Sequence, residues 1–170
     1  MTRAVLVLIV VALLALVLVL MRRGWLSRAR QQEQITRPLP VPPDLLAGGG
    51  AIESSGRYVG TTVEGDWLAR IVVHDLGVPS SASVSVVAEG LCINRPRSSS
   101  FFVPAQALQG ARLDSAACGK AYGPGGVVVV SWMLGGQSVD TGIRLDDVRS
   151  HPKLVADLEP LCAAREGAIQ

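Results

Sequence analysis

An uninterrupted stretch of apolar residues near the amino terminus constrains this chain more than any other feature. Residues 4–21 are almost all Val, Leu, Ile and Ala, with no Gly, Pro or polar side chain among them. As an α-helix this stretch would be about 27 Å long, close to the hydrocarbon thickness of a bilayer. The simplest interpretation is a single membrane-spanning anchor over residues 4–21.

A cleaved signal peptide is the competing interpretation of this stretch. Its basic region would consist of Arg3 alone, and its apolar core would exceed the usual length of a signal-peptide core. No small-x-small cleavage site follows, since the chain continues as Met21-Arg22-Arg23. We therefore expect the anchor to be retained.

Basic residues follow the apolar stretch, whereas only Arg3 precedes it. The positive-inside rule then places the amino terminus outside and the rest of the chain in the cytoplasm. The three cysteines agree with a reducing compartment, because a disulfide framework normally uses an even number. The residues expected at the membrane interface, where they would meet anionic lipid headgroups, are Arg22, Arg23, Trp25, Arg28 and Arg30.

The charge of the chain divides at about residue 37. Residues 1–37 hold six arginines and one glutamate, a net charge of +5, and the remaining 10 basic and 13 acidic side chains give −3. A nucleic-acid-binding protein would carry its positive charge on the folded part. The sequence therefore predicts no nucleic-acid partner.

Prolines and glycines dominate residues 31–55, between the basic segment and the rest of the chain. Residues 37–43 cannot be helical, because proline lacks an amide hydrogen and restricts the residue before it. We expect a stiff spacer followed by a flexible one. The spacing Arg37-x-x-Pro40-x-x-Pro43 also fits ligands of SH3-type grooves, although any proline-rich tether can produce it.

From residue 56 the apolar residues alternate with a period of two, which predicts about seven short antiparallel strands. The most apolar segment, residues 127–133, is expected to be a central strand. After residue 145 the period changes, and Leu154, Leu158 and Leu161 share one helical face. We therefore expect a barrel or sandwich over residues 56–166, closed by a helix over about 148–164. Whether Pro160 breaks that helix stays open.

Several segments of the strand region resemble one particular family. The chain is similar to short bacterial membrane proteins that have one amino-terminal span and a pleckstrin-homology-like (PH-like) cytoplasmic domain, often labelled as export or transporter proteins. The resemblance covers roughly two-thirds of the chain. The segments that carry it include residues 58–62, 65–71, 82–96, 102–105, 125–132 and 140–142.

The resemblance transfers no catalytic residue and no cofactor. Lipid-binding PH domains carry basic residues on the loop between their first two strands, whereas Glu64-Gly65-Asp66-Trp67 is acidic here. His74-Asp75 could serve a Ser-His-Asp triad, but the chain has no G-x-S-x-G elbow and His74 is interpreted as a strand-end residue. Trp67 and Trp132 are expected in the core.

One basic cluster remains as a candidate contact for a ligand or partner. Arg95 and Arg97 flank Pro96 before three serines, a pattern that also suits a solvated turn. We expect a non-enzymatic, membrane-anchored binding or scaffold module that recruits a protein partner lying near the membrane. The alternatives are an accessory subunit of a transport or export complex and, less favoured, a membrane-tethered hydrolase.

Overall fold

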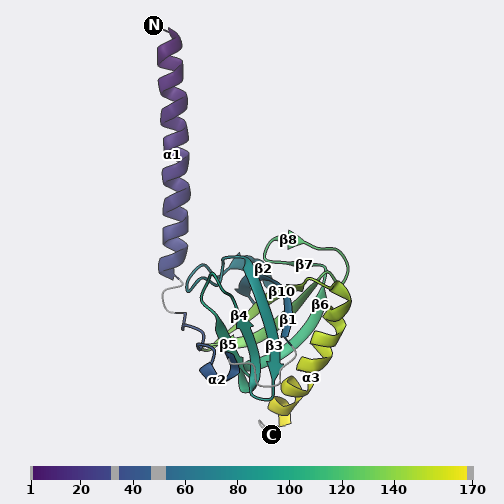
Figure 1. Ribbon diagram of the computed structural model, residues 1–170. Coiled ribbons are helices and arrows are strands. Elements are labelled where there is room, and N and C mark those ends of the chain that lie inside the picture. The colour runs from purple at the N-terminus through teal and green to yellow at the C-terminus, as the bar shows by residue number, and fades with distance from the viewer. Residues whose placement is uncertain (1, 32–34, 47–52, 168–170) are drawn as a thin grey trace. The chain divides into compact units, whose positions relative to one another are not determined.

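The computed structural model describes residues 2–31, 35–46 and 53–167 (Figure 1). The chain forms two compact units, Met1–Gln34 and Ile35–Gln170. The first unit is a single helix, and the second is an antiparallel sheet with a carboxyl-terminal helix packed against it.

Helix α1 (Thr2–Gln31) is continuous over 30 residues. Its described large apolar side chains are exposed, including Val7 at 61% and Met21 at 69%. Over the described residues, however, no helix reaches the combination of length and apolarity that crossing a membrane requires. The helical state of residues 4–21 agrees with the sequence, whereas the span expected there gains no support from the structure.

The second unit is built on an eight-stranded sheet with hydrogen-bonded order β5-β4-β3-β1-β10-β9-β6, and β2 pairs with β1 beside this path. A separate two-stranded sheet consists of β7 (Ala116–Ala117) and β8 (Lys120–Ala121). This architecture confirms the mainly-β antiparallel fold predicted from the period-two pattern. The strands of the larger sheet are β1 (Glu53–Val63), β2 (Asp66–Arg70), β3 (Ser80–Val87), β4 (Gly90–Asn94), β5 (Phe101–Pro104), β6 (Leu108–Asp114), β9 (Val127–Leu134) and β10 (Gln137–Leu145).

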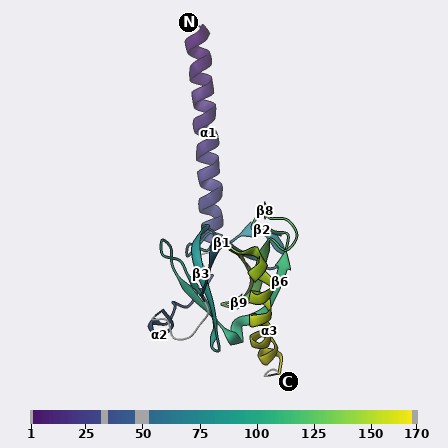
Figure 2. The same cartoon turned by 45° about the vertical axis from the view of Figure 1, so that its right-hand side comes forward.

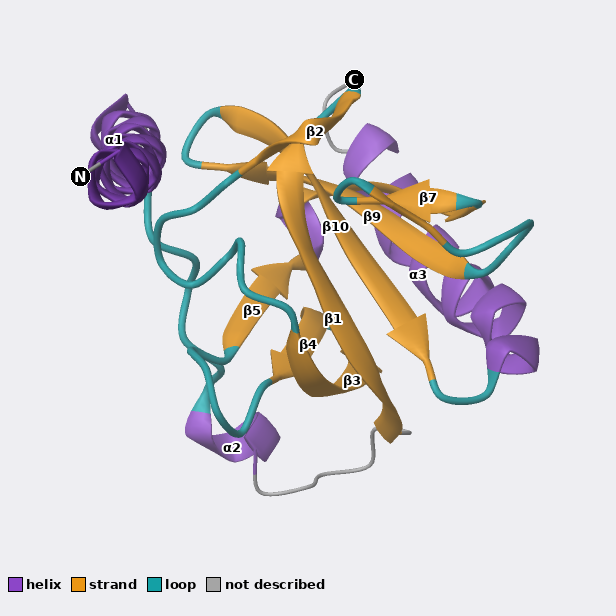
Figure 3. Ribbon diagram, turned by 90° about the horizontal axis from the view of Figure 1, so that it is seen from above, coloured by secondary structure: helices purple, strands orange, loops and turns teal. Residues whose placement is uncertain are grey.

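Strand β1 joins the two halves of the sheet, because its first part pairs with β3 while it also pairs with β10 (Figure 3). Gly56 makes this close approach possible, since a Cβ atom there would collide with the carbonyl oxygen of Arg144 on β10. Farther along, the register with β10 shifts between Tyr58 and Gly60. Such a bulge bends a strand and helps a sheet to curl around its core.

The inward-facing side chains form one continuous core that includes Tyr58, Phe101 and Trp132. Trp132 is 2% exposed, and its indole Nε1 donates a hydrogen bond to Thr141 Oγ1 at 2.8 Å. Its expected burial is thereby confirmed. The same expectation is wrong for Trp67, which is 48% exposed. The reason is that β2 pairs with the end of β1, off the main path of the sheet, so its side chains lie outside the core.

Helix α3 (His151–Gly167) closes the core with Leu154 and Leu158, both buried. It follows the short helix η2 (Val148–Ser150) and packs mainly along β6, as Figures 1 and 2 show. A second short helix, η1 (Ala105–Ala107), links β5 to β6. The predicted carboxyl-terminal helix is therefore present, and Pro160 lies inside it without ending it.

The proline-rich segment packs on the domain, which differs from the free spacer expected over residues 31–55. Leu39 forms an isolated β-bridge with Phe102 of β5, and Val41 is 8% exposed. A short helix, α2 (Pro43–Leu46), follows, and its Leu45 packs in the same small cluster as Val41. Burial of apolar side chains therefore attaches residues 35–46 to the sheet edge. The glycines expected to give flexibility, residues 48–50, lie outside the described residues.

Candidate functional site

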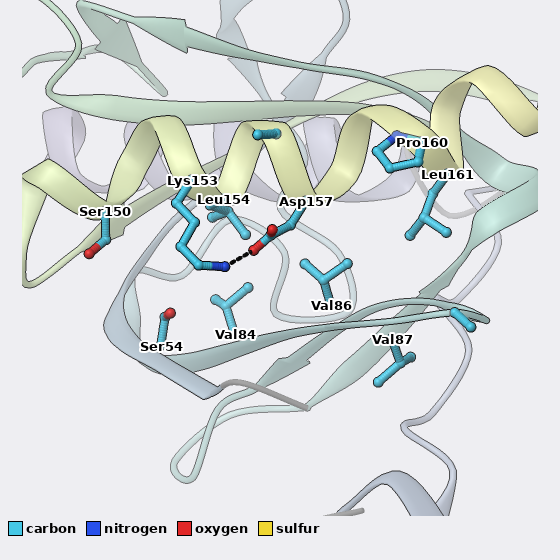
Figure 4. A pocket seen from close by; sticks show the side chains of 12 residues that line it. Ser54, Val84, Val86, Val87, Ser150, Lys153, Leu154, Asp157, Pro160 and Leu161 are labelled. Atoms are coloured by element: carbon cyan, nitrogen blue, oxygen red, sulfur yellow. Dashed lines mark hydrogen bonds and ion pairs between the residues drawn. The ribbon is translucent and has the colours of Figure 1, made fainter. Parts of the chain in front are cut away.

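A cleft of about 560 Å³ opens between α3 and β3 (Figure 4). It lies there because α3 is applied mainly to β6 and η1, which leaves β3 only lightly covered. The cleft volume falls in the range of typical ligand pockets. The apolar side chains that line it are Val84, Val86 and Val87 of β3 and Leu154, Pro160 and Leu161 of α3.

The rim of the cleft carries one ion pair. Lys153 Nζ lies 2.7 Å from Asp157 Oδ2 one turn farther along α3, and both side chains are about half exposed. An exposed pair of this kind contributes at most about 0.5 kcal/mol to stability. Because the two charges compensate each other, the rim has no net attraction for a charged ligand. The cleft therefore suits apolar side chains more than ions.

Pro160 changes the hydrogen bonding of α3 beside the cleft. A proline inside a helix supplies no amide hydrogen to the carbonyl four residues earlier, which here belongs to Ala156. Ala156 and Pro160 both line the cleft. The Ala156 carbonyl therefore receives no hydrogen bond from the residue four positions later.

Sequence analysis did not single out this cleft, although both of its walls were visible in the pattern. Val84 and Val86 lie in the region of period-two alternation, and Leu154 and Leu161 were expected on one face of the helix. These four side chains, two from β3 and two from α3, line a common site. The sequence pattern gave no indication of the gap between β3 and α3.

Arg95, predicted as a contact for a ligand or partner, is buried in the domain with 1% exposure. Its guanidinium carbon lies 4.4 Å from the ring centroid of Tyr58. Its Nε and Nη2 donate to the Ser99 carbonyl at 2.9 and 2.7 Å, and its Nη1 donates to the Asp75 carbonyl at 3.1 Å. Burial lowers the pKa of Arg95. The prediction of a contact role is wrong for this residue, since its donors serve the protein's own loops.

Arg97, the second residue of that prediction, is exposed in the turn between β4 and β5. The two arginines are thus not a joint binding patch, although they are two positions apart. The difference arises because Arg95, directly after β4, points its side chain inward to the Ser99 and Asp75 carbonyls, whereas Arg97 belongs to the turn itself. Arg97 alone keeps the accessibility that a contact residue needs.

The loop whose Asp75 carbonyl accepts from Arg95 contains His74 and Asp75, both with positive φ angles. Such left-handed backbone is uncommon for these residue types and is held here by side-chain contacts. His74 Nε2 lies 2.8 Å from the Ile35 carbonyl oxygen, and Asp75 Oδ2 accepts a hydrogen bond from the Ser99 hydroxyl at 2.9 Å. The two side chains take separate partners, so they do not form the His–Asp pair considered for a hydrolase.

A second polar cluster, which the sequence analysis missed, lies on the outer face of the sheet. Asp140 of β10 is 7% exposed, and it accepts hydrogen bonds from Ser131 Oγ at 2.5 Å and from Arg112 Nη2 at 2.8 Å. The hydrogen bond to Asp140 raises the pKa of Arg112. The sequence gives little indication of this cluster: Ser131 is the one polar residue of the otherwise apolar β9, whereas β6 and β10 each carry several polar residues. The cluster ties β6, β9 and β10 together.

The five residues predicted at the membrane interface all fall within α1. Arg22 and Arg23 are exposed. The side chains of Trp25, Arg28 and Arg30 lie outside the described part of the structure. The prediction that these residues meet lipid headgroups stays a prediction.

No metal site is found in the portion of the chain that the structure describes, taking groups of three or more His, Cys, Asp and Glu side chains. The expectation that the protein needs no cofactor is untested.

Comparisons with known proteins give one family match. Residues 36–159 match the family model described as "Bacterial PH domain-like". No curated protein matches the chain. Neither finding supports an export or transporter label.

Among solved structures, the chain is similar to a chain of "The 8S snRNP Assembly Intermediate", with 8% sequence identity and a TM-score of 0.47. The similarity covers 76% of this chain and 90% of that one. The family match extends over most of the 170 residues and includes the docked proline-rich segment, all strands and most of α3. The chain therefore belongs to the bacterial PH domain-like family.

Proposed function

We propose that the PH-like domain is a non-enzymatic binding module whose cleft between α3 and β3 holds a segment of a protein partner. The observation that carries the proposal is the chemistry of the cleft, with an apolar lining from two elements and a charge-compensated rim. Val86, Val87 and Leu161 are partly exposed in the cleft, and they would gain free energy when apolar side chains cover them. The Ala156 carbonyl, to which Pro160 has no amide hydrogen to donate, would accept a hydrogen bond from the backbone of that segment.

We further propose that the module works at the bacterial inner membrane, with the domain in the cytoplasm. The support is the composition of residues 4–21, the arginines that follow them, and the exposed apolar side chains of α1. An apolar surface of that extent is unfavourable in water and normally marks an interaction with a membrane or a protein. In this proposal, residues 4–21 anchor the domain beside its partner.

A matched pair of positions on α3 tests the role of the cleft. Ala156 and Glu159 are both exposed on the same helix, but only Ala156 lines the cleft. A photo-crosslinking amino acid at position 156 of the full chain, in cells, should give a discrete protein adduct, whereas the same amino acid at position 159 should not. Adducts at both positions or at neither would reject the cleft as the binding site.

A second pair of variants checks that the adduct depends on cleft shape. Ala156→Lys places a long charged side chain at the cleft wall, and Glu159→Lys places the same side chain on the helix away from it. With the crosslinker at Val87 on the opposite wall, the first variant should abolish the adduct and the second should preserve it. Equal thermal melting of the two variants would show that both are folded.

The membrane proposal has its own test. The full chain should stay with membranes after alkaline extraction and should keep residues 1–21 when its mass is measured. A Lys120→Cys variant, at an exposed position of β8, should react with an impermeant maleimide only after the inner membrane is permeabilised. Release by alkali, loss of residues 1–21 or labelling in intact cells would refute the proposal.

A further inference from the structure

In the docked proline-rich segment, burial against the domain repeats every three residues. Pro38 and Val41 are buried against the domain, whereas Arg37, Pro40 and Pro43 are exposed. Four prolines over residues 38–43 favour polyproline II, which has three residues per turn. One face of the segment therefore lies on the sheet edge, and the face that carries Arg37, Pro40 and Pro43 points to solvent.

Two kinds of contact hold the buried face in place. The amide of Phe102 on β5 donates to the Leu39 carbonyl at 2.8 Å. Val41 packs in a cluster with Cys92 and Phe102, against which Leu45 also packs. The segment is thus anchored through one backbone group and the side chains of one face. Its exposed side chains take no part in that anchoring.

The exposed residues have the spacing that SH3-type grooves read. Such grooves accept two dipeptides ending in proline, three residues apart, and place an acidic pocket against a basic residue at one end of the ligand. Here the dipeptides are Leu39-Pro40 and Pro42-Pro43, and the basic residue is Arg37. Leu39 is 54% exposed. Among the residues that the structure describes, none forms an ion pair with Arg37.

We propose that this proline ridge, formed by Arg37, Leu39, Pro40, Pro42 and Pro43, is a ligand presented to a protein with an aromatic groove of the SH3 type. The two residues that such a groove leaves uncovered are the two that the domain buries, Pro38 and Val41. Docking on β5 fixes the backbone of the ridge up to Pro43, where α2 begins, so less conformational entropy is lost on binding. The ridge is separate from the cleft, so this inference does not depend on the function proposed above.

The test uses the purified full chain and, as probe, a purified SH3 domain that binds Arg-x-x-Pro-x-x-Pro peptides. Titration followed by calorimetry should detect binding by the wild type. Arg37→Glu and Pro40→Ala should each weaken it by about tenfold or more, because the first removes a charge-assisted contact and the second one of the two proline contacts. Arg57→Glu, at an exposed arginine of β1, is the matched control and should bind as the wild type does.

Two outcomes would overturn the inference. One is the absence of binding by the wild type up to millimolar concentration, or equal binding by the wild type and Arg37→Glu. The other is tighter binding by a free peptide of residues 35–46 than by the full chain, since docking would then hinder the ridge. Thermal melting of each variant keeps these results apart from unfolding, because Arg37 and Pro40 are exposed and their loss should leave the melting temperature unchanged.

Discussion

Replacing Arg95 with alanine should destabilise the PH-like domain strongly, although sequence analysis gave this residue as a candidate contact for a ligand or partner. The guanidinium is 1% exposed and donates three hydrogen bonds, two to the Ser99 carbonyl and one to the Asp75 carbonyl. It also lies 4.4 Å from the Tyr58 ring centroid and 5.5 Å from that of Phe101. Alanine would leave both carbonyls without these donors and open a cavity between two aromatic rings.

The magnitude follows from these contacts. Hydrogen bonds from a charged group contribute about 1.5–3 kcal/mol each when they are isolated, but several bonds of one side chain are not additive. A desolvated cation–π contact adds about 2 kcal/mol. Part of this sum is offset because a buried guanidinium is costly to desolvate. We expect the free energy of unfolding to fall by about 3–5 kcal/mol, a large share of the roughly 5–15 kcal/mol that stabilises a domain.

The assay is urea unfolding of the full chain, followed by tryptophan fluorescence, with Trp132 reporting from the core. Arg97→Ala is the matched control, since Arg97 is exposed two residues later and its loss should change the free energy by less than about 0.5 kcal/mol. Arg95→Lys should fall between the two, because lysine keeps the charge but not the planar set of donors. Equal stability of Arg95→Ala and Arg97→Ala would refute the reasoning.

Three other substitutions test the remaining polar interior. His151→Ala should lower the free energy of unfolding by about 2–4 kcal/mol in urea unfolding. The reason is that the fully buried ring accepts from the Leu145 amide at 2.9 Å and contacts the Gly125 carbonyl at 2.8 Å. A cost below about 1 kcal/mol would contradict this account. Asp140→Asn should cost about 1–3 kcal/mol, because it removes the charge that Arg112 and Ser131 share, and a neutral result would mean that the cluster is only a surface contact. Burial raises the pKa of the Cys118 thiol from 9.0 to about 11, so its contribution to stability is fully present below pH 9 and is lost as the pH rises through 11. Cys118→Ala should therefore flatten the decline of stability between pH 9 and 11, and an unchanged slope would exclude the thiol as a cause.

Much of the fold was predictable because its signals are local. The continuous apolar run over residues 127–133 indicated a strand, and the change of period after residue 145 indicated the helix that closes the sheet. Leu154 and Leu161 of the cleft were also assigned to one face of the helix. The site itself was not predictable, because its existence depends on α3 resting on β6 and leaving a gap above β3.

The amino-acid sequence by itself determined the mainly-β character of residues 56–145, the closing helix that follows and the apolar character of residues 4–21, since periodicity and composition are properties of neighbouring residues. Only the tertiary structure decided which turn residues are buried and which tryptophan is exposed. Arg95 and Arg97 are two positions apart in the same turn region, yet a loop 20 residues earlier contacts Arg95 and Arg97 stays exposed. Likewise, the prolines of residues 37–43 would suit a free spacer, and it is the uncovered edge of β5 that binds them. Burial depends on what packs against a side chain from elsewhere in the chain, and that information is absent from any short stretch of sequence.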